Sequence, residues 1–215
     1  MVALLAAAFP SRGLVERHTG DTDAGIPVEL AASGVLHREL TAAGYVANSG
    51  NRYVKTDSPT PQPTIDVLIP SRDGTFRPQI EGGRAYDAVP GLALALHRSL
   101  RLQVHALLRN SDELDFQLMV PSVEIAVILK AYSWADRAAQ KDVIDLSNLL
   151  HIVDHHGADA IGGWRLGDST LIGARLDAAR RLHDLVRVAE AGRLRRGPVD
   201  PRKLVVLIRR HVTRP

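Results

Sequence analysis

Three aspartates in the first third of the sequence have the spacing and surroundings of a carboxylate cluster. Asp21 and Asp23 lie two positions apart in "RHTGDTDAGI", and Asp66 lies in the apolar run "TIDVLI". Because side chains alternate along a strand, residues i and i+2 share a face, and Asp21 and Asp23 can serve one site. An unpaired charge inside an apolar strand is unfavourable, so Asp66 requires a compensating partner.

Carboxylates in this pattern suit Mg²⁺ or Mn²⁺, because these cations prefer oxygen ligands that substrate phosphates can complete. If the two strands are neighbours, three carboxylates can hold two ions about 4 Å apart, which stabilises the attacking and leaving oxygens of a phosphoryl-type displacement. We therefore predict that Asp21, Asp23 and Asp66 bind the metal and that Asp66 is the candidate base. The alternative for Asp-x-Asp is a turn in which Asp bonds its own backbone.

Charges also occur at apolar positions of segments with helical spacing. Lys130 lies within "AVILKAY", so its ammonium requires a carboxylate partner or a bound phosphate, unless it reaches water from a helix edge. Asp142 and Asp145 are i and i+3 neighbours on one helix face. The helix dipole also explains a negative charge at Asp142, near the helix start. Asp145 lies a turn deeper among apolar residues, which favours a functional role.

The composition limits the class of protein. A hydrophobic content of 45% in 215 residues predicts a packed core, and the absence of cysteine excludes disulfides and thiolate metal sites. The opening "MVALLAAAFP" has no basic segment and about half of the roughly 20 apolar residues that a membrane span requires. We predict a buried helix there, a cytoplasmic location and no membrane partner.

Positive charge is concentrated at the C-terminal end. From residue 175 onward there are 12 Lys and Arg against 4 Asp and Glu, whereas the preceding residues have 15 against 20. This segregation suggests that one region holds a polyanion while chemistry occurs in another. The alternative is a solvated arginine-rich helix face. The arginines that we expect to contact RNA are Arg180, Arg181, Arg187, Arg193, Arg195 and Arg196.

The pattern of apolar residues predicts an α+β fold with a mixed sheet followed by helices. Short apolar runs separated by turn residues indicate strands up to about residue 119, interrupted by one helical segment at 27–48 that ends near Gly44. The stretch 92–108 is compatible with one helix or two strands. After Pro121 the spacing is helical, with Ser122 as an N-cap and Gly157 as a stop. We predict a sheet domain at 1–120 and a helical, basic region at 121–215.

Three segments resemble, in order, the motifs of the nucleotidyltransferase superfamily, and specifically its AbiEii-like or MenT-like toxins of bacterial toxin–antitoxin systems. They are "RHTGDTDAGI", "PTIDVLIP" and "VPSVEIAVILKAYSWADRAAQKDVIDLSNLL". The resemblance covers roughly residues 20–150. It implies a mixed sheet that carries the three aspartates, with NTP and Mg²⁺ bound between this sheet and the C-terminal helices.

The same resemblance implies roles for further residues. Lys130 corresponds to a phosphate-contacting lysine, and Asp145 and Asp142 to the acidic residues of the "KDxxD" element. Arg17 and Thr19 lead into the first motif and are candidates to support the metal strand or the nucleotide. The chain departs from the family before that motif, where "LLAAAFPSRG" replaces a Gly-Gly or Gly-Ser pair. Ser11 and Gly13 are the candidate substitutes for nucleotide binding. The alternative is that the true start lies upstream and that this sequence lacks the first strand and helix of the family.

The expected activity is transfer of a nucleoside monophosphate from an NTP to RNA, with pyrophosphate leaving. For the toxin group the acceptor is a tRNA 3′ end, translation stops, and a cognate antitoxin protein restrains the enzyme. Two alternatives stay open at this point. One is transfer to a protein or small-molecule hydroxyl, and the other is a catalytically inactive module that binds RNA or a partner.

Overall fold

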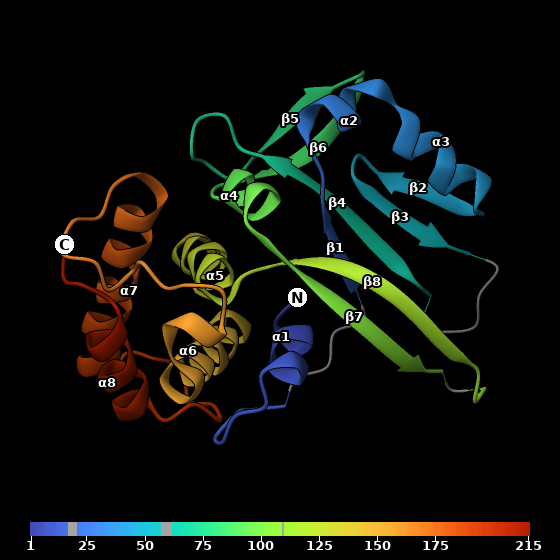
Figure 1. The fold of residues 1–215 in the computed structure, drawn as a ribbon. Coiled ribbons are helices and arrows are strands. Elements are labelled where there is room, and N and C mark those ends of the chain that lie inside the picture. The colour runs from blue at the N-terminus through green and yellow to red at the C-terminus, as the bar shows by residue number, and fades with distance from the viewer. Residues whose placement is uncertain (17–20, 57–61, 109) are drawn as a thin grey trace. The chain divides into compact units, whose positions relative to one another are not determined.

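The computed structural model describes residues 1–16, 21–56, 62–108 and 110–215 (Figure 1). They form a mixed α+β fold with a mixed sheet and C-terminal helices, as the sequence predicts. The chain divides into two units. The sheet unit comprises residues 16–96, and the helical unit comprises residues 1–15 and 97–215. The predicted division at residue 120 assigns the first helix and residues 97–120 to the sheet part instead.

Strand β4 organises the sheet unit. It pairs in parallel with β1 and β6 and antiparallel with β3, whereas β2 extends the sheet beyond β3 and β5 extends it beyond β6. Residues 64–66 pair with β1 and β3 simultaneously, so these two strands lie on opposite edges of β4. The strands are β1 (Asp21–Gly25), β2 (Tyr45–Ser49), β3 (Arg52–Lys55), β4 (Thr64–Pro70), β5 (Arg77–Glu81) and β6 (Arg84–Val89).

One face of this sheet forms the hydrophobic core of the unit. Helices α2 (Val28–Ser33) and α3 (Val35–Ala42) supply the apolar residues that pack against it. The buried members are Ile26, Ala31, Tyr53, Val67, Ile69, Tyr86 and Ala88. Since side chains alternate along each strand, the residues between these core positions lie on the opposite face.

The single helical segment predicted at 27–48 is two helices in the structure. Gly34 adopts a left-handed conformation (φ 67°, ψ 3°) that ends α2 and starts α3. Glycine adopts this conformation without steric penalty, so the apolar spacing continues while the helix does not. Gly44 follows α3, as predicted.

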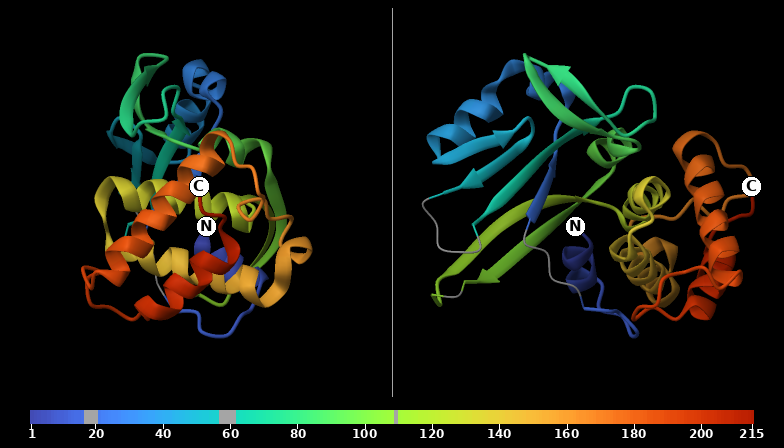
Figure 2. Two further views of the ribbon diagram at one scale, coloured as in Figure 1. Left: turned by 90° about the vertical axis from the view of Figure 1, so that its left-hand side faces the viewer. Right: turned by 180° about the vertical axis from the view of Figure 1, so that it is seen from behind.

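The described residues of the helical unit form five helices and a hairpin. Helix α6 packs against α1, α5 and α8, and α7 packs against α5 and α8 (Figures 1 and 2). None of the helices among the described residues is long and apolar enough to cross a bilayer. The helices are α1 (Val2–Ala8), α5 (Val123–Arg137), α6 (Gln140–Ala160), α7 (Gly173–Glu190) and α8 (Pro201–His211).

The predicted helix signals in this unit are confirmed. Ser122 caps α5 by accepting a hydrogen bond from the Ile125 amide. Asp200, for which no cap was predicted, accepts hydrogen bonds from the first amides of α8. Gly157 has non-helical angles within the span of α6, where the sequence predicts a stop. Val2 and Leu5 are buried, which confirms the expected buried helix at the N-terminus.

The ambiguous stretch 92–108 is neither one helix nor two strands. It forms a short helix, α4 (Leu92–His97), and then strand β7 (Ser99–Leu107), which pairs antiparallel with β8 (Glu113–Pro121). The strands predicted up to about residue 119 thus include β8, which ends at Pro121. Cross-strand partners such as Val104 and Phe116 place apolar residues on one hairpin face, and partners such as Gln103 and Gln117 place polar residues on the other.

Polar side chains connect the elements of the helical unit. The buried Glu124 of α5 accepts hydrogen bonds from both Nε and Nη2 of Arg175 on α7 and from the Arg165 amide. The hydrogen bond to Glu124 raises the pKa of Arg175, against the lowering effect of burial. Asn148 of α6 donates to the Val15 carbonyl and accepts from its amide, both at 2.8 Å, which fixes the N-terminal segment on the helix.

Candidate carboxylate site and polar pocket

Asp23 and Asp66 are directly opposed on neighbouring strands. In the parallel pairing of β1 with β4, Asp23 is in register with Asp66, and Asp21 is in register with Thr64. Cross-strand partners present their side chains on the same face. This face is opposite the core face, since the core residues Ile65 and Val67 alternate with Asp66. The strand that contains Asp-x-Asp and the strand that contains Asp66 are therefore neighbours, as a shared carboxylate site requires.

The compensating partner of Asp66 is Arg52. Arg52 is in register with Asp66 across the β3–β4 pairing, and it donates from Nε to Oδ1 at 2.7 Å and from Nη2 to Oδ2 at 2.6 Å. The Asp66 side chain is 13% exposed and that of Arg52 is 47% exposed. The site is therefore a row of Asp23, Asp66 and Arg52 across three adjacent strands, and the arginine neutralises the less exposed carboxylate.

Several predicted residues cannot be placed in this row. Arg17 and Thr19 lie outside the described residues, and so does the side chain of Asp21. Among the side chains that are described, no three His, Asp or Glu residues form a group able to hold a metal ion. Asp23 and Asp66 nevertheless supply the anionic oxygen donors that a hard divalent cation requires, from adjacent strands and on one face.

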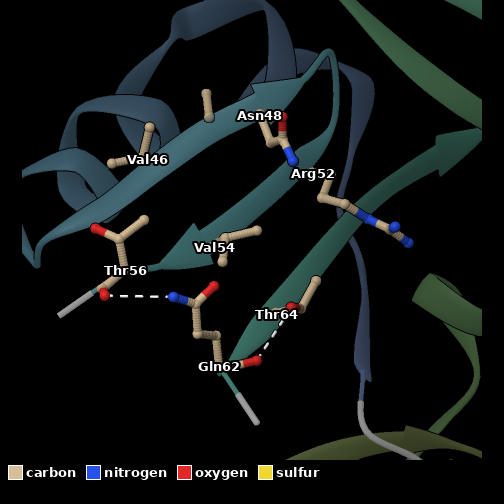
Figure 3. A pocket seen from close by; sticks show the side chains of 8 residues that line it. Val46, Asn48, Arg52, Val54, Thr56, Gln62 and Thr64 are labelled. Atoms are coloured by element: carbon tan, nitrogen blue, oxygen red, sulfur yellow. Dashed lines mark hydrogen bonds between the residues drawn. The ribbon is translucent and has the colours of Figure 1, made fainter. Parts of the chain in front are cut away.

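A pocket of about 500 Å³ adjoins this row in the sheet unit (Figure 3). Two of its lining residues are close to Asp66. Arg52 is the cross-strand partner of Asp66, and Thr64 lies two positions before Asp66 in the same strand. The Gln62 amide donates to the Thr56 carbonyl at 3.3 Å, and the Thr64 hydroxyl donates to the Gln62 carbonyl at 3.2 Å. The lining residues are Val46, Ala47, Asn48, Arg52, Val54, Thr56, Gln62 and Thr64.

The second group of predicted residues lies in the helical unit. Lys130 Nζ on α5 is 2.7 Å from Asp145 Oδ2 and 3.8 Å from Asp142 Oδ1, both on α6. Arg137 donates from Nε and Nη2 to the two carboxylate oxygens of Asp142, each at 2.7 Å. Asp142 and Asp145 are almost completely buried, and the Lys130 side chain is 15% exposed. Lys130 therefore has a carboxylate partner, which is one of the two kinds of partner that the sequence predicts for it.

Ser11 is also in the helical unit, in the segment that follows α1. Its hydroxyl donates to the Phe9 carbonyl at 3.0 Å. Gly13, two residues later, has φ +80°, and a Cβ there would lie 3.1 Å from Lys203 Nζ and 3.2 Å from the His151 ring. The segment therefore turns back against α6 and α8, and the Ser11 hydroxyl stabilises that turn.

The basic C-terminal arginines fall into two groups. Arg180 and Arg187 pair with Asp177 and Asp184 three residues earlier, and Arg181 stacks over the Tyr132 ring at 4.1 Å. The second group is exposed and has no ion pair among the described residues. Its members are Arg193, Arg195, Arg196, Arg202 and Lys203. They lie in the segment between α7 and α8 and in the first turn of α8.

Two residues of these networks were not foreseen from the sequence. Arg52 lies in "NSGNRYVK", and its role depends on the pairing of β3 with β4, for which the sequence contains no local signal. The pairing of Arg137 with Asp142 depends on a local feature. Ala138 adopts a left-handed conformation (φ 47°) that reverses the chain between α5 and α6. Comparisons of the chain with protein-family models, curated proteins and solved structures found no match.

Proposed function

We propose that the protein is a metal-dependent nucleotidyltransferase that moves a nucleoside monophosphate from an NTP to the 3′ end of an RNA, with tRNA as the acceptor. The observation that supports this most is the register of Asp23 with Asp66 on the sheet face opposite the core. This register brings two carboxylates together on one face, where their oxygens can share a hard divalent cation.

The proposed reaction is an in-line displacement at the α-phosphorus of the NTP. The acceptor oxygen forms a bond to that phosphorus, the bond to the β-phosphate oxygen breaks, and pyrophosphate leaves. Mg²⁺ bound by the carboxylates supplies charge stabilisation at the attacking and leaving oxygens. A carboxylate oxygen of Asp66 takes the proton of the acceptor hydroxyl. Arg52 holds that carboxylate in one orientation through its two hydrogen bonds.

The exposed basic group at residues 193–196 and 202–203, which has no ion pair among the described residues, supports an RNA acceptor. Cations without intramolecular partners are available to phosphates, and neutralising phosphates supplies most of the affinity in nucleic-acid binding. We assign the RNA backbone contacts to this group. In this proposal the protein blocks translation as a toxin, and a cognate antitoxin restrains it.

A catalytically inactive RNA-binding module is the second candidate. The ion pairs of Asp66 with Arg52 and of Asp145 with Lys130 favour it, because they give each of these charges a structural partner. The opposed pair of Asp23 and Asp66 argues against it. Transfer to a protein or small-molecule hydroxyl is a third possibility that the exposed basic group disfavours.

Label transfer tests the proposal directly. Purified protein is incubated with total tRNA, Mg²⁺ and each of the four α-³²P-labelled NTPs, and RNA and protein are separated on denaturing gels. We expect label in tRNA with the wild type and none with Asp23→Ala, whose exposed position predicts an unchanged circular dichroism spectrum. Label in protein would indicate the alternative acceptor. Absence of label from every fraction, including reactions with Mn²⁺, would refute the proposed nucleotidyltransferase activity.

A further inference from the structure

The polar pocket lies beside Asp66 in the sheet unit. Its wall consists of residues from β2, β3, the start of β4 and the positions next to these strands, and it includes Arg52 and Thr64 (Figure 3). Across the sheet the order is β1 with Asp23, β4 with Asp66, β3 with Arg52 and then β2. The pocket is therefore on the Asp66 side of the carboxylate row and away from the Asp-x-Asp strand.

The lining of the pocket has a distinct chemistry. Among the described residues that line it, Arg52 alone is charged, and none of them has a carboxylate or an aromatic ring. Val46 and Val54 are apolar, whereas the Asn48 amide and the Gln62 Oε1 atom have no hydrogen-bond partner among the described residues. Such a wall tolerates a phosphate, packs the apolar face of a sugar or base, and hydrogen-bonds base edges and hydroxyls. It offers no platform for stacking.

The charge of the pocket decides between the two substrates. An NTP carries a triphosphate that requires several cations, whereas the described lining of the pocket supplies one guanidinium, which already pairs with Asp66. In an in-line displacement the attacking and leaving oxygens are on opposite sides of the phosphorus, and the base contacts the attacking oxygen. A pocket beside the base is therefore on the acceptor side of the reaction.

We infer that this pocket binds the 3′-terminal nucleotide of the RNA acceptor, with its terminal hydroxyl directed to Asp66. The inference rests on the proposed nucleotidyl transfer. Asn48 and Gln62 contact the edges of that nucleotide, and Arg52 is a positioning residue for Asp66.

Binding of a short RNA separates this inference from the proposed activity. The probe is a 5′-fluorescein-labelled trinucleotide, CCA with a free 3′ hydroxyl, titrated by fluorescence anisotropy without NTP. Removing two hydrogen-bonding side chains in Asn48→Ala/Gln62→Ala is expected to weaken probe binding about tenfold. The matched control is Gln103→Ala/Gln117→Ala on the polar face of the β7–β8 hairpin, which should bind the probe as the wild type does.

Steady-state transfer to tRNA provides the second readout. The KM for tRNA should rise about tenfold in the pocket variant, while the KM for NTP stays within about twofold. A rise in the KM for NTP alone would overturn the inference and make the pocket a nucleotide site. Unchanged probe binding would overturn it as well, and so would preferential labelling of a serine-containing peptide. If the wild type binds the probe through Asn48 and Gln62 but transfers no label, the proposed activity fails and the RNA site stands.

Discussion

The guanidinium of Arg52 engages both carboxylate oxygens of Asp66 from the neighbouring strand, at 2.7 and 2.6 Å. A fixed positive charge beside this carboxylate weakens its attraction for a second cation, such as the proposed divalent ion. Asp66 therefore has two competing partners, one built into the fold and one from solution. The competition provides a direct measure of whether the carboxylate row binds metal.

Replacing Arg52 should strengthen metal binding. In Arg52→Gln a positive charge next to the carboxylates is removed, and we expect the affinity for Mn²⁺, measured by isothermal titration calorimetry, to rise about tenfold. Arg77→Gln is the matched control, because Arg77 forms an ion pair with Asp73 elsewhere in the same unit. An affinity that is unchanged or lower in Arg52→Gln would show that Arg52 and the metal do not compete.

The Lys130–Asp145 pair should contribute to the stability of the helical unit. Lys130→Met leaves Asp145 buried without its ammonium partner, and we expect the free energy of unfolding to fall by about 3 kcal/mol. Lys130→Met/Asp145→Leu replaces the pair by apolar side chains and should recover most of this loss. Both tryptophans, Trp134 and Trp164, lie in the helical unit, so their fluorescence in a urea titration reports its unfolding.

Lys141→Met is the control for this experiment. Lys141 is exposed near the start of α6, and its replacement should change the free energy of unfolding by no more than about 0.5 kcal/mol. If Lys130→Met abolishes label transfer and leaves stability unchanged, the ion pair is dispensable for folding. The phosphate-contacting role that the family resemblance implies for Lys130 would then be the better explanation.

Local signals account for the part of the structure that the sequence predicted. Ser122 begins α5 through its own side chain, Gly157 interrupts α6, and Asp66 in an apolar strand indicated a compensating partner. Nothing local identified that partner. Arg52 meets Asp66 only because β3 and β4 are antiparallel neighbours, and register between strands depends on the packing of the whole sheet.

The failures have equally specific causes. The apolar spacing of residues 27–48 continues through Gly34, so periodicity alone predicted one helix where a left-handed residue divides it. In the stretch 92–108, six residues form α4 and the next strand starts after a single intervening residue, which is too short a scale for periodicity to resolve. The charge count located the basic region correctly but did not distinguish Arg180 and Arg187, which have local partners, from Arg195 and Arg196.

That distinction gives a prediction for RNA binding. Arg195→Glu/Arg196→Glu should weaken tRNA binding and reduce the slope of log K against log salt by about 0.7 to 0.9 for each phosphate that the variant no longer neutralises. Filter binding at several salt concentrations measures both quantities. Arg180→Glu/Arg187→Glu has the same change in charge and serves as the control, with a smaller expected effect. Equal effects of the two double variants would show that net charge alone attracts RNA.

Tyr132 should make the helical unit sensitive to alkali. Burial, together with the nearby Asp177 carboxylate, raises the pKa of Tyr132 to about 12, and its hydroxyl donates to Asp177 Oδ2 at 3.2 Å. The folded state thus keeps a proton that the unfolded chain releases above about pH 10. Since the folded state binds more protons in this range, the free energy of unfolding must fall as the pH rises from about 10 to 12.

Tyr132→Phe removes the titrating group and should flatten this decline. The variant lacks one hydrogen bond, so it should be less stable than the wild type by about 1 kcal/mol at about pH 8. The difference should shrink as the pH rises above about 10 and reverse in sign before about pH 12, because only the wild type has a proton to release on unfolding and a pKa raised to about 12 outweighs one hydrogen bond. Urea titrations followed by tryptophan fluorescence at intervals across this range measure it. A difference that stays constant would mean that the Tyr132 hydroxyl titrates alike in the folded and unfolded chains.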